Sequence, residues 1–157
     1  MNLQRIKSER GQSLVELSVS LVLLLILLAG IVDLGRAIIA YFVLQDAAEE
    51  GIVYGVGFPT DCNQITLRVR SDIKGQFVNA SQTTVSITIL GPDNSTYISC
   101  YTIPYAQVYA GKIMKIAVKY NFPITMPFLG SILGEQSIPM TITTNGTILR
   151  PPPPPGS

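Results

Sequence analysis

One glutamate stands at the start of the most apolar stretch of this chain. Glu16 is the only charged residue between Leu14 and Val32, and it follows the short segment Arg10-Gly11-Gln12-Ser13. A carboxylate at the edge of a membrane span costs about 1–3 kcal/mol, depending on its depth. We therefore expect Glu16 to act together with a partner group.

No other group of residues indicates catalysis. The chain has no histidine, its carboxylates are scattered, and GxSxG, HExxH and phosphate-binding glycine motifs do not occur in it. Two thiols cannot complete a zinc shell. A net charge of +1 with 13% charged residues creates no basic field for nucleic acid. We predict no enzyme activity, no catalytic residue, no cofactor, no metal and no nucleic-acid partner.

Residues 14–32 are long and apolar enough to cross a membrane. At 1.5 Å per residue this helix would span about 28 Å, close to one hydrocarbon core. Three basic residues and one acidic residue precede it: Arg5, Lys7, Arg10 and Glu9. This bias predicts a cytoplasmic N-terminus, with everything after Val32 outside the cytoplasm.

The apolar run has two other interpretations. A buried helix of a soluble protein is disfavoured by the Leu-rich composition. A cleaved secretory signal is disfavoured because Leu28-Ala29-Gly30 is a poor cleavage site and the helical pattern continues beyond it.

The two cysteines, Cys62 and Cys100, both fall in the exported part. In an oxidising compartment an even pair is most simply a disulfide, and two free thiols are the alternative. A bridge closing a loop of about 37 residues would stabilise the fold by about 3–4 kcal/mol in the chain-entropy model.

Helical periodicity continues beyond the span. It predicts one long helix over residues 12–56, with its end between Gly51 and Gly57, where glycines and Pro59 break the pattern. A four-residue repeat predicts a second, amphipathic helix through Ile65, Val69, Ile73 and Phe77, packed on a sheet.

Four stretches then carry strand signals: Thr83–Leu90, Thr96–Ile103, Lys112–Phe122 and Ser137–Leu149. We expect the second to contain Cys100, and the third to be interrupted by Pro123 and Pro127. The last should be broken by Pro139 and by the turn-like pair Asn145-Gly146. Residues 128–133 could form a helical turn.

These elements predict an α+β fold, in which a small exported domain with a short helix and an antiparallel sheet of about four strands follows the long helix. The expected organisation is a leader at 1–11, the long helix at 12–56, an exported head at 57–150 and a Pro-rich tail at 151–157.

The segment Arg10-Gly11-Gln12…Glu16 resembles the processing site of type IV pilin-like proteins: a basic leader ending in glycine, with glutamate fifth after it. In that family a membrane aspartyl peptidase cuts after the glycine, which corresponds to Gly11. The new N-terminal residue, here Gln12, is commonly methylated in some branches. The fifth residue, here Glu16, pairs with the α-amino group of a neighbouring subunit.

Two departures from true type IV pilins narrow the resemblance. Gln12 replaces the usual phenylalanine or methionine, and Ser18 and Ser20 lie near the start of the span. Both features are similar to TadE-like pseudopilins of tight-adherence (Tad/Flp) pili. Two further segments agree, the span-end motif containing Asp33, Gly35 and Arg36, and the stretch Leu44–Gly51. The resemblance is specific only through about residue 55.

The resemblance implies a minor pseudopilin, because major subunits of these pili are very short chains. Its partners would be a prepilin peptidase, other pilin and pseudopilin subunits, the assembly platform and the lipid bilayer. It would be a single-pass protein of the cytoplasmic membrane that can reach a surface pilus used in adhesion or secretion. The alternatives are an uncleaved bitopic envelope protein with an extracytoplasmic binding domain, and a secreted small enzyme or inhibitor.

Overall fold

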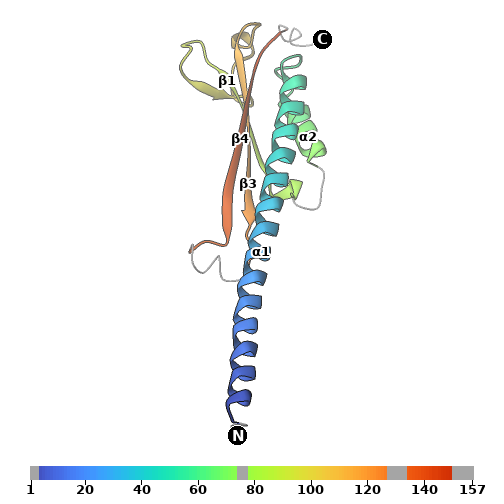
Figure 1. The fold of residues 1–157 in the computed structure, drawn as a ribbon. Coiled ribbons are helices and arrows are strands. Elements are labelled where there is room, and N and C mark those ends of the chain that lie inside the picture. Colours follow the sequence, from blue (N-terminus) through green and yellow to red (C-terminus); the bar gives the residue numbers. More distant parts are fainter. Residues whose placement is uncertain (1–3, 74–77, 127–133, 150–157) are drawn as a thin grey trace.

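The computed structural model describes residues 4–73, 78–126 and 134–149, with side chains from Gly11 onward. One long helix, α1 (Gln4–Gly55), runs from the N-terminal end through the full height of a small head (Figure 1). Its 52 residues correspond to about 78 Å. The helix ends at Gly55, within the range that the glycine-rich sequence predicts.

The head contains a short helix and an antiparallel sheet. Helix α2 (Cys62–Asp72) precedes strands β1 (Thr84–Leu90), β2 (Tyr97–Ser99), β3 (Ile113–Pro123) and β4 (Ser137–Thr147). The strand order is β2-β1-β3-β4, and every neighbouring pair is antiparallel. The predicted α+β class is confirmed. The expected turn at 128–133 and the Pro-rich tail lie outside the described residues, as does Phe77.

The core lies between α1, α2 and one face of the sheet. Strand β3 alternates strictly, and its side chains facing α1 are at most 4% exposed: Met114, Ile116, Val118, Tyr120 and Phe122. Helix α2 begins at an N-cap, where the Asp61 side chain accepts a hydrogen bond from the Gln64 N–H. Its buried residues Ile65 and Val69 pack in the same core.

Two glycines let α1 approach α2 and the sheet closely. A β-carbon on Gly51 would lie 2.3 Å from Val69 Cγ2, and one on Gly55 would lie 2.6 Å from Met114 Sδ. Both distances are too short for any non-bonded contact. The glycines are therefore packing residues inside a helix, where glycine is otherwise unfavourable by about 1 kcal/mol.

This packing predicts opposite effects of one substitution at two helical glycines. Gly51→Ala should destabilise the head by about 1–3 kcal/mol through overpacking. Gly35→Ala is the matched control, because a β-carbon at Gly35 meets nothing within 4 Å. It should be neutral or stabilising by up to about 1 kcal/mol. Urea unfolding followed by tyrosine fluorescence measures both, since the chain has no tryptophan and its seven tyrosines all lie at or beyond Tyr41. Equal stability of the two variants would contradict the packing argument.

Two strand expectations were wrong. Strand β4 is continuous from Ser137 to Thr147, although Pro139 and Asn145-Gly146 were expected to break it. Proline is tolerated because β4 is an edge strand. Gly146 pairs with Met114, and a β-carbon there would lie 2.6 Å from Ile52, so close packing of α1 explains this glycine. Pro123 likewise does not interrupt β3 but is its last residue.

The second strand is shorter than expected. Strand β2 covers only Tyr97–Ser99, so Cys100 follows the strand instead of lying within it. The chain turns immediately afterwards, because the N–H groups of Thr102 and Ile103 both donate to the Ser99 carbonyl. The disulfide Cys62–Cys100 is present, with a Cα–Cα distance of 6.0 Å. It joins the first turn of α2 to the end of β2.

Candidate assembly and processing site

The predicted processing residues Gly11 and Gln12 lie in a part of α1 that no other described element contacts. Gly11 and Gln12 are in helical conformation, and every described side chain from Gly11 to Leu28 is exposed. The side chain of Arg10 is outside the described part. A β-carbon on Gly11 would meet nothing within 4 Å, so no contact within the described chain requires glycine there.

Glu16 follows Gln12 by one helical turn, which places the two residues on the same side of α1, about 6 Å apart along the axis. Its neighbours on α1 are large apolar residues that are also exposed, such as Leu14 at 67% and Leu17 at 65%. Within the described residues, no hydrogen bond or ion pair involves Glu16. Its carboxylate therefore remains available to a group outside this part of the chain.

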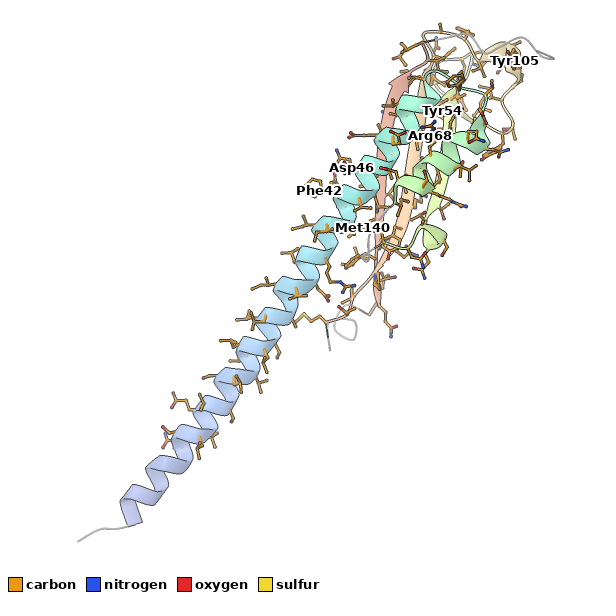
Figure 2. All side chains as sticks on the ribbon, turned by 90° about the vertical axis from the view of Figure 1, so that its right-hand side faces the viewer. Phe42, Asp46, Tyr54, Arg68, Tyr105 and Met140 are labelled. Atoms are coloured by element: carbon orange, nitrogen blue, oxygen red, sulfur yellow. A yellow bond between two sulfur atoms is a disulfide. The ribbon has the colours of Figure 1, made fainter. Side chains whose placement is uncertain are left out.

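The apolar segment of α1 has the properties of a membrane span. Residues Gly11–Gly55 form the one helix among the described residues that is long and apolar enough to cross a bilayer. Figure 2 shows the lower part of α1 extending away from the head with its side chains uncovered. Ser18, a polar residue within it, donates its hydroxyl to the Val15 carbonyl at 2.8 Å. Because of that bond, the hydroxyl needs no hydrogen-bond partner from a second helix, as expected for a single-pass membrane protein.

The span-end motif proves to be the junction between α1 and the head. Asp33 lies on the helix face that looks toward the sheet and is 8% exposed. Its carboxylate accepts hydrogen bonds from the N–H groups of Thr125 at 3.0 Å and Met126 at 2.6 Å, and from the Thr125 hydroxyl. Thr125 and Met126 directly follow β3, so Asp33 ties the lower end of the sheet to the helix.

Arg36 completes this junction from the next turn of α1. Its guanidinium pairs with Asp33 at 2.9 Å and donates to the Thr125 hydroxyl at 2.5 Å. It also lies over the Phe122 ring, 5.4 Å from the centroid. Burial raises the pKa of Asp33, but the bonds from Thr125, Met126 and Arg36 outweigh it, and the net pKa is below its ordinary value of 3.8.

Gly35 does not take part in the junction, since nothing lies within 4 Å of where its β-carbon would be. Thr125 was missed in the sequence, because it lies 92 residues from Asp33 and only the fold brings the two together. In the sequence, Asp33 and Arg36 stand out only as part of a family-like motif, and that motif does not indicate their partners.

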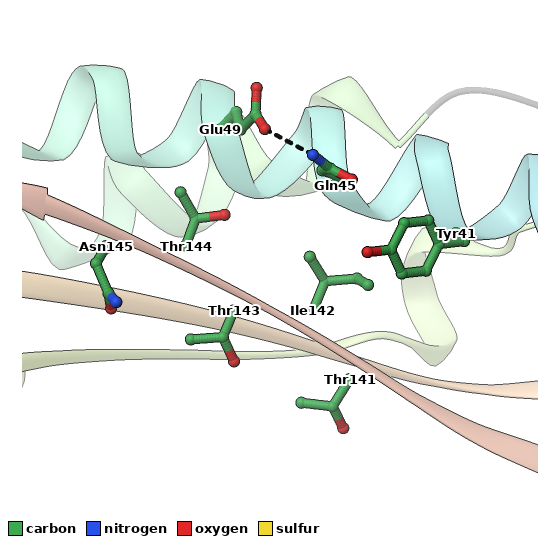
Figure 3. Close-up of a pocket in the computed structure, with 8 residues that line it drawn as sticks. All are labelled: Tyr41, Gln45, Glu49, Thr141, Ile142, Thr143, Thr144 and Asn145. Atoms are coloured by element: carbon green, nitrogen blue, oxygen red, sulfur yellow. Dashed lines mark hydrogen bonds between the residues drawn. The ribbon is translucent and has the colours of Figure 1, made fainter.

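A polar groove separates α1 from edge strand β4 (Figure 3). Its volume is about 500 Å³, and its lining comes from one side of α1 and from the middle of β4: Tyr41, Gln45, Glu49, Thr141, Ile142, Thr143, Thr144 and Asn145. Gln45 donates to Glu49 at 3.0 Å within it. The described residues contain no group of His, Cys, Asp and Glu that could hold a metal ion. The groove offers hydrogen-bonding groups from both α1 and β4.

A comparison with family models matches residues 11–52 to the family described as TadE-like protein. The match covers Gly11, Gln12, Glu16, the apolar segment and the Asp33–Arg36 pair, but neither Arg10 nor the sheet. No curated protein and no solved structure matches the chain. The TadE-like resemblance seen in the sequence is therefore confirmed over residues 11–52, which lie in the N-terminal helix.

Proposed function

We propose that this chain is a minor pseudopilin, a structural and assembly component of a Tad (Flp) pilus that a prepilin peptidase cuts after Gly11. The observation that carries the proposal is that two residues, Gly11 and Glu16, have no structural role within the described part of the chain. Gly11 has no packing function within the described chain, and Glu16 has no partner there. Cleavage would create an ammonium group on Gln12. This ammonium would supply the opposite charge that Glu16 of a neighbouring subunit needs.

Helical glycine at the cut also has a physical advantage. A peptidase needs an extended backbone, so the turn around Gly11 has to unwind before cleavage. Glycine is about 1 kcal/mol less favourable in a helix than alanine, which lowers the cost of unwinding. It also leaves room for the close approach of the enzyme to the main chain.

In this proposal the chain sits in the cytoplasmic membrane with its N-terminus in the cytoplasm and its head outside. Prepilin peptidase acts on the leader, and other pilin or pseudopilin subunits and the assembly platform contact the helix. The family match over residues 11–52 supports a pilus-associated component. The α+β head makes the chain larger than a major subunit of such a pilus.

Mass analysis of the membrane-extracted protein tests the proposal. In cells with an active cognate peptidase, the N-terminus should be Gln12, methylated or cyclised where those modifications occur. Gly11→Ala should reduce leader removal at least about tenfold, because a crowding and unwinding cost of about 1.4 kcal/mol is already a factor of ten. Gly35→Ala is the control and should be cut normally. An intact Met1 in the wild-type protein would refute the proposal and favour an uncleaved bitopic envelope protein.

A further inference from the structure

The sheet has one face that no described element covers, here called the open face. Side chains of alternate residues point away from α1, as Figure 3 shows for Thr141, Thr143 and Asn145 on β4. On β3 the open face carries Lys115 and Lys119, which the register places opposite Asn145 and Thr141. The four strands contain no aspartate or glutamate. The charge that the strands contribute to this face is therefore purely positive.

The exposed side of α1 carries an acidic stripe, Asp46 and Glu49. Both side chains are exposed, whereas Leu44, Ala47 and Ala48 beside them are buried against the rest of the head. Asp46 therefore points away from the sheet, whereas Glu49 lies beside it at the rim of the groove between α1 and β4. From Ala37 to Gly55 the helix has no basic residue. Within the described residues, neither Asp46 nor Lys119 forms an ion pair.

The stripe and the open face lie at similar heights along α1. Gly51 lies beside Ile116, where an added β-carbon would be 3.2 Å from Ile116 Cδ1. Lys119 is three residues below Ile116 on β3, or about 10 Å. Asp46 and Glu49 are five and two residues below Gly51 on the helix, or about 7.5 and 3 Å. If two copies are anchored at the same depth in the membrane, Lys119 of one copy would lie within about 3 Å of the level of Asp46 of the other, measured along the helix axis.

The same contact can also form when neighbouring subunits are offset along the helix axis, as assembly would require. If Gln12 of one subunit pairs with Glu16 of its neighbour, the two are offset by four residues, or about 6 Å. When the copy that presents its open face is the higher one, its Lys119 moves from the level of Asp46 to the level of Glu49. Two carboxylates one turn apart can therefore serve the lysine before and after assembly.

We propose that the open face of one subunit binds the acidic stripe of a second copy of this chain, through Lys119 facing Asp46 and Glu49. The inference rests on the membrane anchoring in the proposed function. The open face and Asp46 lie on opposite sides of the head, so the contact is heterologous, and each added copy leaves a free stripe and a free open face. Exposed ion pairs contribute little each, about 0–1 kcal/mol, but a shared membrane raises the effective concentration, and charge sets the choice of neighbour.

Zero-length carbodiimide cross-linking in membranes tests this contact, because it joins an amine directly to a carboxylate. The wild type should yield a dimer with Lys119 linked to Asp46 or Glu49. Lys119→Glu should lower the dimer yield about fivefold or more, since it places like charges together. Asp46→Lys with Glu49→Lys should do the same. Arg70→Glu, which reverses an exposed cation on α2 away from the open face, is the matched control and should have no effect.

Co-expression of the two charge-reversed chains makes the test decisive. Each reversed chain repels its own copies, but the open face of either one attracts the stripe of the other. Dimers should therefore return to about the wild-type yield, as mixed pairs only. Wild-type dimers linked through other residues, or unchanged yield with Lys119→Glu, would overturn the proposal. A yield that falls without rescue in the mixture would also overturn it, by assigning the open face to a different subunit.

The N-terminal mass separates this result from the proposed function. A mature Gln12 terminus together with unaffected charge reversals would leave the pseudopilin proposal standing and remove the contact. An uncut Met1 terminus together with charge-dependent cross-links would remove the pseudopilin proposal and leave the contact standing. Tyrosine fluorescence confirms that each variant folds, as expected for substitutions at exposed side chains.

Discussion

Replacing Glu16 by leucine is expected to abolish or strongly reduce incorporation into the pilus while leaving the protein in the membrane. Leucine lengthens the apolar surface of α1 and removes the cost of a carboxylate at the span edge, so insertion should be normal or improved. The head lies far above this residue and should fold unchanged. What is lost is the opposite charge for an ammonium on a neighbour's Gln12.

A buried ion pair is a weak source of net stability but a good source of register, because only one stagger satisfies both charges. Glu16→Gln keeps the shape without the charge and should fail like Glu16→Leu. Glu16→Asp, one methylene shorter, should be intermediate. Pilus assembly, membrane level and leader removal are scored together for each variant, with Ser20→Leu as a control that removes a polar group without a charge. Normal assembly with Glu16→Leu would show that the charge is incidental.

Replacing Asp33 by alanine is expected to cause a large loss of head stability. The change removes the acceptor of the Thr125 and Met126 N–H groups and the ion pair between Asp33 and Arg36. Hydrogen bonds to a charged group contribute about 1.5–3 kcal/mol each and are not additive. We therefore expect a loss of about 2–3 kcal/mol in urea unfolding followed by tyrosine fluorescence. Asp46→Ala, an exposed aspartate on the same helix, should change the stability little.

The contribution of Asp33 should depend on pH in a defined direction. Its pKa is lower in the folded protein than its ordinary value of 3.8, so the folded state favours the charged form. That stabilisation is fully present above the unfolded pKa and is lost as the pH falls through the folded pKa. The stability difference between wild type and Asp33→Ala should be constant from pH 5 to 8 and shrink below about pH 4. A difference that grows in acid would contradict the role of the ionised carboxylate.

Local patterns in the sequence determined the helix, the class of fold and the resemblance of the helix to the TadE-like family. The apolar run, the charge bias before it and the Gly11–Glu16 spacing are properties of neighbouring residues, so no tertiary information is needed to see them. The strict alternation of Lys112–Phe122 identified β3 for the same reason. The cysteine pair was predictable from compartment and number, and the structure contains the Cys62–Cys100 bridge.

Only the tertiary structure decided how the head is attached to the helix and which surfaces it leaves open. Asp33 meets Thr125 across 92 residues, and Gly51, Gly55 and Gly146 are glycines because another element passes too close for a β-carbon. The local turn propensity of Asn145-Gly146 predicted a break in the strand. Pairing with β3 and packing against α1 outweigh that propensity and keep β4 continuous. Such contacts depend on residues distant in the chain, and their free energies exist only once the elements are packed.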